Sequence, residues 1–181
     1  GYVYEPSIWQ AGEPRGGLTE NWLAKMARRH GVYIGATYLE ADGEDFFNTF
    51  TLMRPDGAVA GRVRKLSLPA FEGWFFKSSD GPKFIDTDIG RIGVGICNDN
   101  NLSEFMQRLH HDRPDIVLQP HSAPMVRGYE RASRMMCQCL EAIPIFYAKQ
   151  LGVPTLMVNK ASLRGSPTRA PVALLRMIFD F

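Results

Sequence analysis

The sequence contains little cysteine and almost no excess of charge. Only three of its 181 residues are cysteines. Two of them, Cys137 and Cys139, fall in one expected helix, where side chains two positions apart point away from each other, so a disulfide scaffold is not expected. Lysine and arginine number 21 against 19 aspartates and glutamates, and this net charge of +2 provides no bulk attraction to nucleic acid or to an anionic membrane. A reducing, cytoplasmic setting is the expectation.

Several sequence patterns are also missing. No run approaches the about 18 apolar residues of a membrane helix, and residues 1–10 lack the basic leader and apolar core of a secretion signal. There is no G-x-S-x-G motif of a serine hydrolase, and the glycines of residues 90–95 do not open a helix as a dinucleotide-binding loop requires. His110 and His111 are adjacent and face apart, and Cys137-x-Cys139 has no matching second pair, so no zinc site is expected. The sequence calls for no metal and no organic cofactor.

What is present is the composition of a globular α/β domain, with 45% hydrophobic and 22% charged residues. Apolar periodicity predicts a helix over Leu18–His30, with Thr19 as its N-cap and Trp22 on its apolar face. Pro55-Asp56-Gly57 separates two β-rich runs and predicts an antiparallel hairpin.

The second half of the chain alternates between short apolar runs and helical patterns. The expected elements are strands at Lys83–Asp86, Arg91–Cys97, Ile116–Gln119 and Val153–Asn159, and helices at Asn101–His111 and Tyr129–Gln150, the last interrupted by Pro144. Hairpin and crossover connections together predict a mixed sheet that is covered by helices on one face and needs other cover on its second face.

Cys97 follows a glycine-rich apolar strand and precedes the polar residues Asn98–Asn101. Ligand sites in α/β folds concentrate at such carboxyl ends of strands. Near the start of the next helix, the helix dipole and a nearby cation would favour the thiolate that a nucleophile needs. The alternative is a buried structural cysteine.

Lys65 ends a strand directly after Arg64, so the alternation of strand side chains predicts that one of the two points inward. An inward Lys65 can donate to a developing oxyanion or hold a thiolate, whereas the alternative is a solvated strand end.

Glu72 and His121 are the other two candidates for acid–base chemistry. Glu72 is the only carboxylate within the aromatic segment Phe71–Phe76, a setting that suits proton transfer, and its alternative is a place at the rim of an ordinary aromatic core. His121 follows a short buried strand and is either the base for Cys97 or a hydrogen-bonding residue of the same rim.

Further segments complete a pattern in a fixed order. They are Asn48-Thr49, Pro55-Asp56-Gly57, Lys65-Leu66-Ser67-Leu68-Pro69, Glu72, Gly90-Arg91-Ile92-Gly93-Val94-Gly95-Ile96-Cys97, Asp99, Glu104, Asp115–Pro120, and Leu151-Gly152-Val153-Pro154 before Asn159. In order and spacing they resemble the carbon-nitrogen hydrolase (nitrilase) superfamily, over residues 31–159.

The resemblance implies one domain, residues 1–181, folded as a four-layer α-β-β-α sandwich that commonly dimerises through helices, so a homodimer or larger homo-oligomer is expected. It implies Cys97 as the nucleophile, Lys65 as the residue that stabilises the tetrahedral intermediate, and Glu72 as the glutamate that positions the lysine and the substrate. Three more residues are expected beside the substrate: Asn98, Asp99 and His121.

The implied function is a thiol-dependent hydrolase. Its substrate would be a small molecule with a non-peptide carbon–nitrogen bond, in an amide, a carbamoyl amine or a nitrile, cleaved through a thioester on Cys97. The alternative is an inactive nitrilase-like module that binds or oligomerises without turnover.

The sequence departs from the family pattern at both ends. The family's general base is a glutamate shortly before a Gly-Tyr pair, and this sequence begins with Gly1-Tyr2; Glu5 is the nearest substitute but lies on the other side of that pair. Ser166-Pro167 matches a family loop, but residues 172–181 do not show the strands that follow it. The chain is therefore expected to lack the base and the last strands. Asn98 stands where amidases often have Tyr and nitrilases Trp, which leaves the substrate open.

Overall fold

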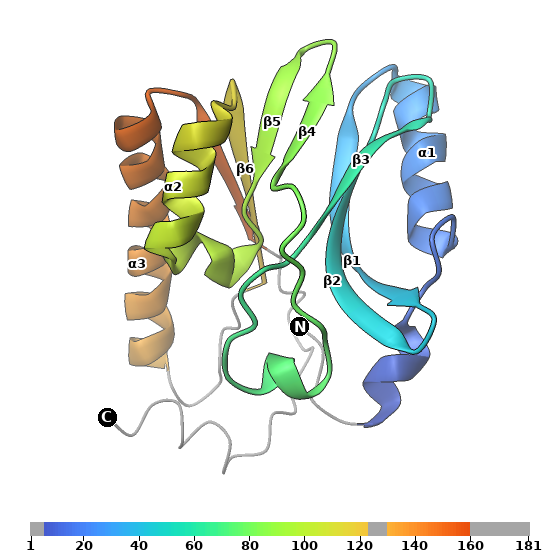
Figure 1. Cartoon of the computed structure of the whole chain (residues 1–181), viewed down its shortest axis with the longest axis horizontal. Helices are drawn as coiled ribbons and strands as arrows, with labels where there is room; N and C mark the ends of the chain where they lie inside the picture. Colours follow the sequence, from blue (N-terminus) through green and yellow to red (C-terminus); the bar gives the residue numbers. More distant parts are fainter. Residues whose placement is uncertain (1–5, 123–129, 160–181) are drawn as a thin grey trace.

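Two β-sheets lie face to face between two outer layers of helices in the computed structural model, which describes residues 6–122 and 130–159 (Figure 1). This arrangement is the four-layer α-β-β-α sandwich that the resemblance implied. The elements are, in chain order, η1 (Pro6–Ala11), α1 (Leu18–His30), β1 (Ile34–Asp42), β2 (Asp45–Met53), β3 (Val59–Arg64), η2 (Ala70–Trp74), β4 (Phe84–Thr87), β5 (Gly90–Val94), η3 (Cys97–Asn101), α2 (Ser103–Asp112), β6 (Ile116–His121), α3 (Glu130–Leu151) and β7 (Thr155–Asn159), where η denotes a 3₁₀-helix.

The first sheet is antiparallel, in the order β1-β2-β3. The hairpin between β2 and β3 closes through hydrogen bonds of 2.8 Å from Arg54 N to the Ala58 carbonyl and from Gly57 N to the Arg54 carbonyl. Gly57 has φ 81°, a left-handed conformation that glycine adopts without a steric penalty. The hairpin predicted from Pro55-Asp56-Gly57 is therefore confirmed.

The second sheet is mixed, in the order β4-β5-β6-β7. β4 and β5 are antiparallel, whereas β5, β6 and β7 are parallel and are connected through α2 and α3. The carboxyl ends of β5 and β6 consequently lie side by side at one edge of the sandwich, the position in parallel sheets where ligand sites form.

The two sheets share one apolar core. Alternate residues of β2, β5 and β6 point into it, and Gly61 of β3 lets Ile85 of β4 approach closely, because a Cβ on Gly61 would lie 2.8 Å from an Ile85 methyl carbon. The fully buried members of this core are Phe50, Leu52, Val63, Ile85, Ile92, Val94 and Ile96.

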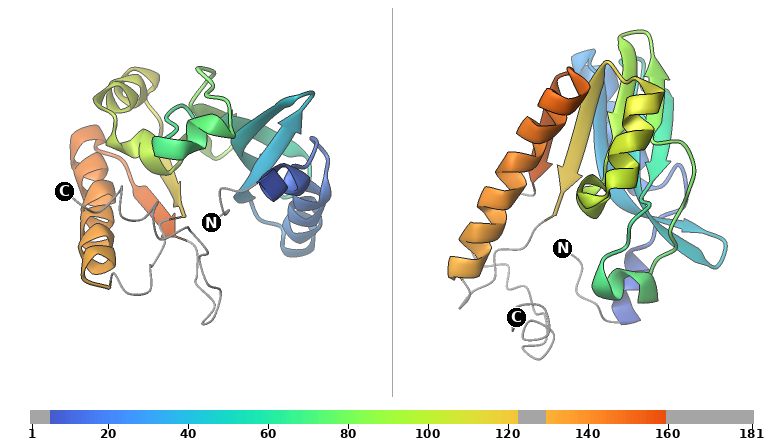
Figure 2. Two further views of the ribbon diagram at one scale, coloured as in Figure 1. Left: turned by 90° about the horizontal axis from the view of Figure 1, so that it is seen from below. Right: turned by 60° about the vertical axis from the view of Figure 1, so that its left-hand side comes forward.

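The helices cover the outer faces of the sheets. α2 and α3 bury Phe105, Leu109 and Tyr147 against Val117 of β6, and α1 packs Leu23 and Ala27 on the first sheet. Figure 2 shows α1 and α3 on opposite outer sides of the molecule. Within the described ranges, no helix has the length and apolar character needed to cross a membrane.

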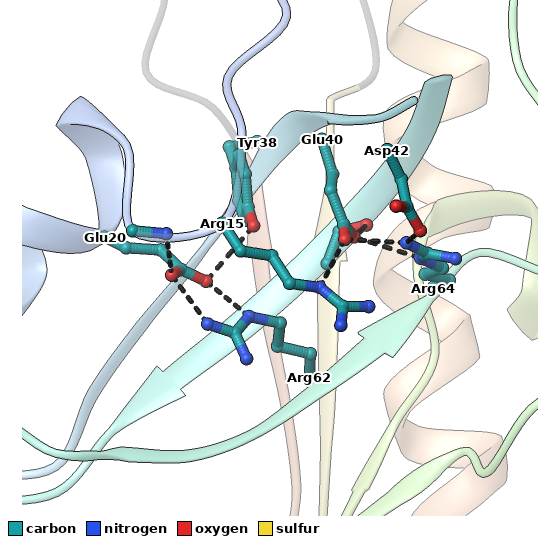
Figure 3. A network of polar contacts seen from close by, with 9 residues as sticks. Arg15, Glu20, Tyr38, Glu40, Asp42, Arg62 and Arg64 are labelled. Atoms are coloured by element: carbon teal, nitrogen blue, oxygen red, sulfur yellow. Dashed lines mark hydrogen bonds and ion pairs between the residues drawn. The ribbon is translucent and has the colours of Figure 1, made fainter. Parts of the chain in front are cut away.

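The interface between α1 and the first sheet also carries charges. Glu40 of β1 is fully buried and accepts hydrogen bonds from Arg15, Arg64 and Thr49 at 2.6–3.0 Å. Glu20 of α1 accepts two from Arg62, at 2.6 and 2.7 Å. Figure 3 shows these two carboxylates lying next to each other along the sheet, each held by arginines of β3.

Burial alone would raise the pKa of both carboxyl groups, but the arginine hydrogen bonds outweigh it. The pKa of Glu20 is lowered to about 2 by Arg62 and by the backbone N–H of Gly16, and that of Glu40 to about 2 by Arg64, Thr49 and Arg15. Both side chains are therefore ionised at neutral pH.

The elements differ from the expected ones in four respects. Gly17, not Thr19, is the N-cap of α1, and Trp22 is 55% exposed instead of lying on the buried face. β5 ends at Val94, so Cys97 begins η3, and the next helix begins at Ser103. Pro144 lies inside α3 without interrupting it.

Candidate active site

Cys97 occupies an unusual backbone position just after β5. It is the first residue of η3 and has φ 51°, in the left-handed region that costs a non-glycine residue about 1–2 kcal/mol. Side-chain hydrogen bonds hold the turn in place: Asn100 Nδ2 donates to the carbonyls of Gly95 and Cys97 at 2.8 and 3.0 Å, and Asp99 Oδ2 accepts from Ile96 N at 3.2 Å. Such conformations persist where the surroundings fix them, and they cluster at active sites.

The environment of the Cys97 thiol is mainly apolar. Burial raises its pKa, and the charge of Glu72 adds to this, while the charge of Lys65 and the backbone N–H groups of Ser122 and Asn98 oppose it. The net direction is upward, so the thiolate expected at a helix start is not favoured in the resting protein. A reaction at Cys97 therefore requires a proton acceptor.

Lys65 is the inward-pointing member of the Arg64–Lys65 pair, of which strand alternation predicted that one would point inward. Its backbone N–H donates to the Asn48 carbonyl at 2.8 Å, and its side chain is 1% exposed. The Lys65 Nζ donates to Glu72 Oε2 at 2.5 Å, and Glu72 is itself 15% exposed. Because both charges act on the Cys97 thiol, β3, η2 and η3 bring one cation, one carboxylate and one thiol into the same site.

Aromatic packing positions the short helix that carries Glu72. Phe76 is buried with Ile8 and Leu39, and the Trp9 ring lies 5.4 Å from the Phe75 ring. Backbone N–H groups of Phe75 and Phe76 both donate to the Glu72 carbonyl, at 3.0 and 2.9 Å. Phe75 and Phe76 thus pack in the core and fix the place of Glu72, whereas Trp74 is 73% exposed.

Asp99 and Asn98 connect the Cys97 turn to the segment that carries Lys65. Asp99 is fully buried, and its Oδ1 accepts from Leu66 N at 3.1 Å and from Ser67 N at 2.7 Å. Asn98 Nδ2 donates to Ser67 Oγ at 2.7 Å, while its Oδ1 accepts from Asn101 at 2.9 Å. Burial raises the pKa of Asp99, although the N–H donors and the charges of Lys83 and Lys65 oppose this shift.

His121 ends β6 and is 7% exposed. Its Nδ1 lies 3.0 Å from the Gln119 carbonyl, which can only accept, so Nδ1 carries the proton and Nε2 presents a lone pair. Burial lowers the His121 pKa, the Gln119 carbonyl opposes this, and the charge of Lys65 lowers the pKa further, so the ring is neutral near pH 7. Its Nε2 is buried and has no hydrogen-bond partner within residues 6–122 and 130–159.

Comparison of the sequence with known protein families agrees with this geometry. The family model described as carbon-nitrogen hydrolase matches residues 1–162. The chain belongs to the carbon-nitrogen hydrolase family.

Individual relatives of this carbon-nitrogen hydrolase carry several activity names. It is 33% identical over 110 residues to a nitrilase of Pyrococcus abyssi, a match that covers 60% of this chain and 42% of that protein. It is 29% identical over 100 residues to a citrullinase of Francisella tularensis (52% and 35% covered) and 27% identical over 122 residues to an omega-amidase of Xenopus laevis (62% and 44% covered). The chain thus spans less than half the length of these curated relatives.

Solved structures agree on the fold. The crystal structure of a carbon-nitrogen hydrolase from Helicobacter pylori has a TM-score of 0.81 at 21% identity, and the match covers 91% of this chain and 57% of that one. A superfamily protein from Xanthomonas campestris with an arsenic adduct in its active site has a TM-score of 0.74 at 21% identity, with 91% and 61% covered.

The structure of this carbon-nitrogen hydrolase brings most of the expected site residues together. The charge of Lys65 acts on both Cys97 and His121, and the charge of Glu72 acts on Cys97. Asn98 and Asp99 have their side chains hydrogen-bonded to protein groups, because both join η3 to the Lys65 segment, and their contact with a substrate stays a prediction. Other residues singled out in the sequence lie elsewhere: Glu104 is exposed in the first turn of α2, and Glu5 and Ser166-Pro167 lie outside the described residues.

One buried charge near the site was not expected from the sequence. Lys83 precedes β4 and is 1% exposed. The strand alternation that places Ile85 in the core places Lys83 on the same inward side, and this was the available signal.

Proposed function

We propose that this carbon-nitrogen hydrolase cleaves a non-peptide carbon–nitrogen bond of a small amide, carbamoyl amine or nitrile by nucleophilic attack of Cys97. The observation that carries the proposal is the buried Lys65–Glu72 pair acting on a thiol that is held at positive φ. A cation beside a nucleophile is the arrangement that stabilises the negative oxygen of a tetrahedral intermediate.

For an amide, the reaction has two stages, the formation of a thioester on Cys97 and its hydrolysis. The Cys97 sulfur bonds to the carbonyl carbon, its proton passes to a base, and the carbonyl oxygen becomes an oxyanion that accepts from Lys65 Nζ. Collapse of the intermediate breaks the carbon–nitrogen bond, and the nitrogen leaves with a proton as ammonia or an amine. Water then cleaves the thioester, releasing the acid and restoring the thiol.

Two groups at the site can handle these protons. Glu72 is the carboxylate whose charge acts on the thiol, and it shares its oxygen with Lys65. We assign to His121 the role of accepting a hydrogen bond from an N–H group of the substrate or of the leaving amine. Its unprotonated Nε2 is buried and unpaired within the described part of the chain. A base is necessary because the pKa of the Cys97 thiol is raised. Such a base typically increases the rate by about 10²- to 10⁴-fold.

The test is product release combined with covalent trapping. The chain is incubated with short primary amides, ureido compounds and nitriles; ammonia is measured, and mass spectrometry follows the peptide containing Cys97 for a transient acyl adduct. Cys97→Ala should abolish both signals, whereas Cys139→Ser, which alters an exposed cysteine of α3, should change neither. Turnover that survives Cys97→Ala would contradict the proposed nucleophile.

The alternative, a module that binds without turnover, is favoured by one observation, the upward shift of the Cys97 pKa. Alkylation of the resting thiol does not decide between the two, because burial slows it in both cases. The acyl adduct does: protection of Cys97 by an amide, without any adduct or ammonia, would support the binding module.

Lys65→Met tests the oxyanion role. It should lower kcat by about 10²-fold or more while leaving the substrate dissociation constant nearly unchanged, because the oxyanion exists only after attack. Lys77→Met, at a 63% exposed lysine, is the matched control. The homo-oligomer and the cytoplasmic setting stay predictions.

A further inference from the structure

The Lys83 ammonium is buried against the segment that carries Lys65. Its Nζ donates to the Arg64 carbonyl and to the Ser79 carbonyl, both at 2.6 Å. The Lys83 carbonyl in turn accepts from Val94 N at 2.8 Å, which ties this lysine to β5. The Lys83 side chain thereby joins the end of β3 to the loop before β4, and its backbone carbonyl joins both to the strand that leads to Cys97.

The segment from Arg64 to Ser67 is hydrogen-bonded at successive backbone groups. Its N–H groups donate to the Asn48 carbonyl and to the Asp99 carboxylate. Its carbonyls accept hydrogen bonds as follows: Arg64 O from Lys83 Nζ, Lys65 O from Ser79 N at 3.0 Å, and Leu66 O from Ser78 Oγ. Only the first of these carbonyl donors is charged. Hydrogen bonds from charged donors are about twice as strong as neutral ones, so Lys83 is the strongest restraint on this side of the segment.

Charged groups from three directions face Lys83. Asp99 of η3 and Asp80 of the preceding loop favour its protonated form, and Arg108 of α2 opposes it. Burial outweighs the carboxylates and lowers the Lys83 pKa to about 8. Lys65 is the cation whose charge lowers the pKa of the Cys97 thiol against the effect of burial.

We propose that Lys83 is a positioning residue: by holding the Arg64 and Ser79 carbonyls, it fixes the backbone from which Lys65 reaches Glu72 and Cys97. The inference rests on the proposed function only in so far as Lys65 acts on Cys97. Without a donor at position 83, two part-buried carbonyls lose the Lys83 hydrogen bond, and the segment must shift toward another donor. Lys65 then moves relative to the thiol.

The test uses the Cys97 thiol as a reporter of where Lys65 lies. Alkylation of Cys97 by iodoacetamide is followed by peptide mapping from about pH 6 to about pH 11, which gives the apparent pKa of the thiol. The variants are Lys65→Met, Lys83→Met and the double variant, with Lys77→Met as the control. Lys83→Gln, which keeps two N–H donors on a shorter side chain, is included in case Lys83→Met does not fold, as judged by circular dichroism.

Removal of the Lys65 charge should raise the thiol pKa and slow alkylation at neutral pH by about tenfold. Lys83→Met should also slow alkylation of Cys97, by a large part of the tenfold effect of Lys65→Met. Lys83→Gln should slow it less. The double variant should be no slower than Lys65→Met alone, because Lys83 acts through Lys65. A residue that only stabilises the fold would lower the urea midpoint without changing the thiol profile.

Two results separate the possible failures. If Lys65→Met leaves the thiol profile unchanged, the proposed role of Lys65 is wrong. If Lys65→Met shifts the profile but folded Lys83→Met or Lys83→Gln does not, or if the two effects add in the double variant, the positioning role of Lys83 is overturned while the proposed function stands.

Discussion

Replacement of Glu40 by glutamine tests whether its buried ion pairs with Arg64 of β3 and with Arg15, which precedes α1, stabilise the first sheet. Glu40 is fully buried, and four hydrogen bonds from Arg64, Thr49 and Arg15 stabilise its charged form. Burial acts in the opposite direction, but the net effect lowers its pKa from 4.5 to about 2. A difference of this size corresponds to about 3 kcal/mol of stability at neutral pH.

The sign follows from the direction of the shift. Because the folded pKa lies below the unfolded one, the unfolded chain binds the proton first, and the stabilisation is lost as pH falls from about 4.5 to about 2. By pH 3 about 2 of the 3 kcal/mol should be gone. Glu40→Gln should therefore lower the free energy of unfolding by about 3 kcal/mol at pH 7 and by only about 1 kcal/mol at pH 3.

Urea titrations followed by circular dichroism at several pH values measure this difference directly. Asp45→Asn, which removes an exposed ion pair with Lys77, is the matched control and should cost less than about 1 kcal/mol at any pH. A Glu40→Gln deficit that stays constant between about pH 7 and about pH 3 would refute the assignment of the stability to an ionised Glu40.

Three further outcomes follow from the packing and the buried charges. Gly95→Ala places a methyl group against the Asn100 amide and 2.7 Å from a Phe105 ring carbon, so it should displace the Cys97 turn and slow alkylation of that thiol by about tenfold or more at equal pH. Leu109→Ala, at a fully buried position between α2 and the second sheet, should lower the free energy of unfolding by about 2–5 kcal/mol in urea titrations. The pKa of Lys83 is about 8 in the folded state against 10.5 normally, so between about pH 8 and pH 10.5 the unfolded chain binds a proton that the folded chain has lost. The free energy of unfolding of the wild type should therefore rise by about 3 kcal/mol over this range relative to that of Lys83→Met. A difference that does not change with pH would contradict this.

Local patterns in the sequence were sufficient for several features. Turn chemistry at Pro55-Asp56-Gly57 predicted the hairpin, because the glycine meets a demand for positive φ that few residues can meet. Strand alternation predicted that one of Arg64 and Lys65 points inward, and Gly31 predicted the end of α1, where it adopts the left-handed C-cap conformation.

Other features depend on contacts between distant segments. Asp99 is visible in the sequence as an acidic residue near Cys97, but its partner Ser67 lies 32 positions away and becomes its donor only when the two sheets pack together. The positive φ of Cys97 likewise arises from surrounding hydrogen bonds, since no local propensity favours it in a cysteine. Trp22 was expected on the apolar face of α1 together with Leu23 and Ala27; those two residues are buried against the sheet, but Trp22 is 55% exposed, and an ion pair of Glu20 with Arg62 adds to the contact.

The backbone of Cys97 has a consequence for how this chain can change over evolutionary time. At φ 51° glycine would relieve about 1 kcal/mol of backbone strain but would lose the packing of the Cys97 side chain against the core between the sheets. A lineage that no longer needed the thiol could therefore accept glycine at position 97 with little change in stability. Cys97→Gly should therefore yield a protein that is harder to unfold than Cys97→Ala, and the difference between the two measures the conformational strain that accompanies a reactive side chain at this place.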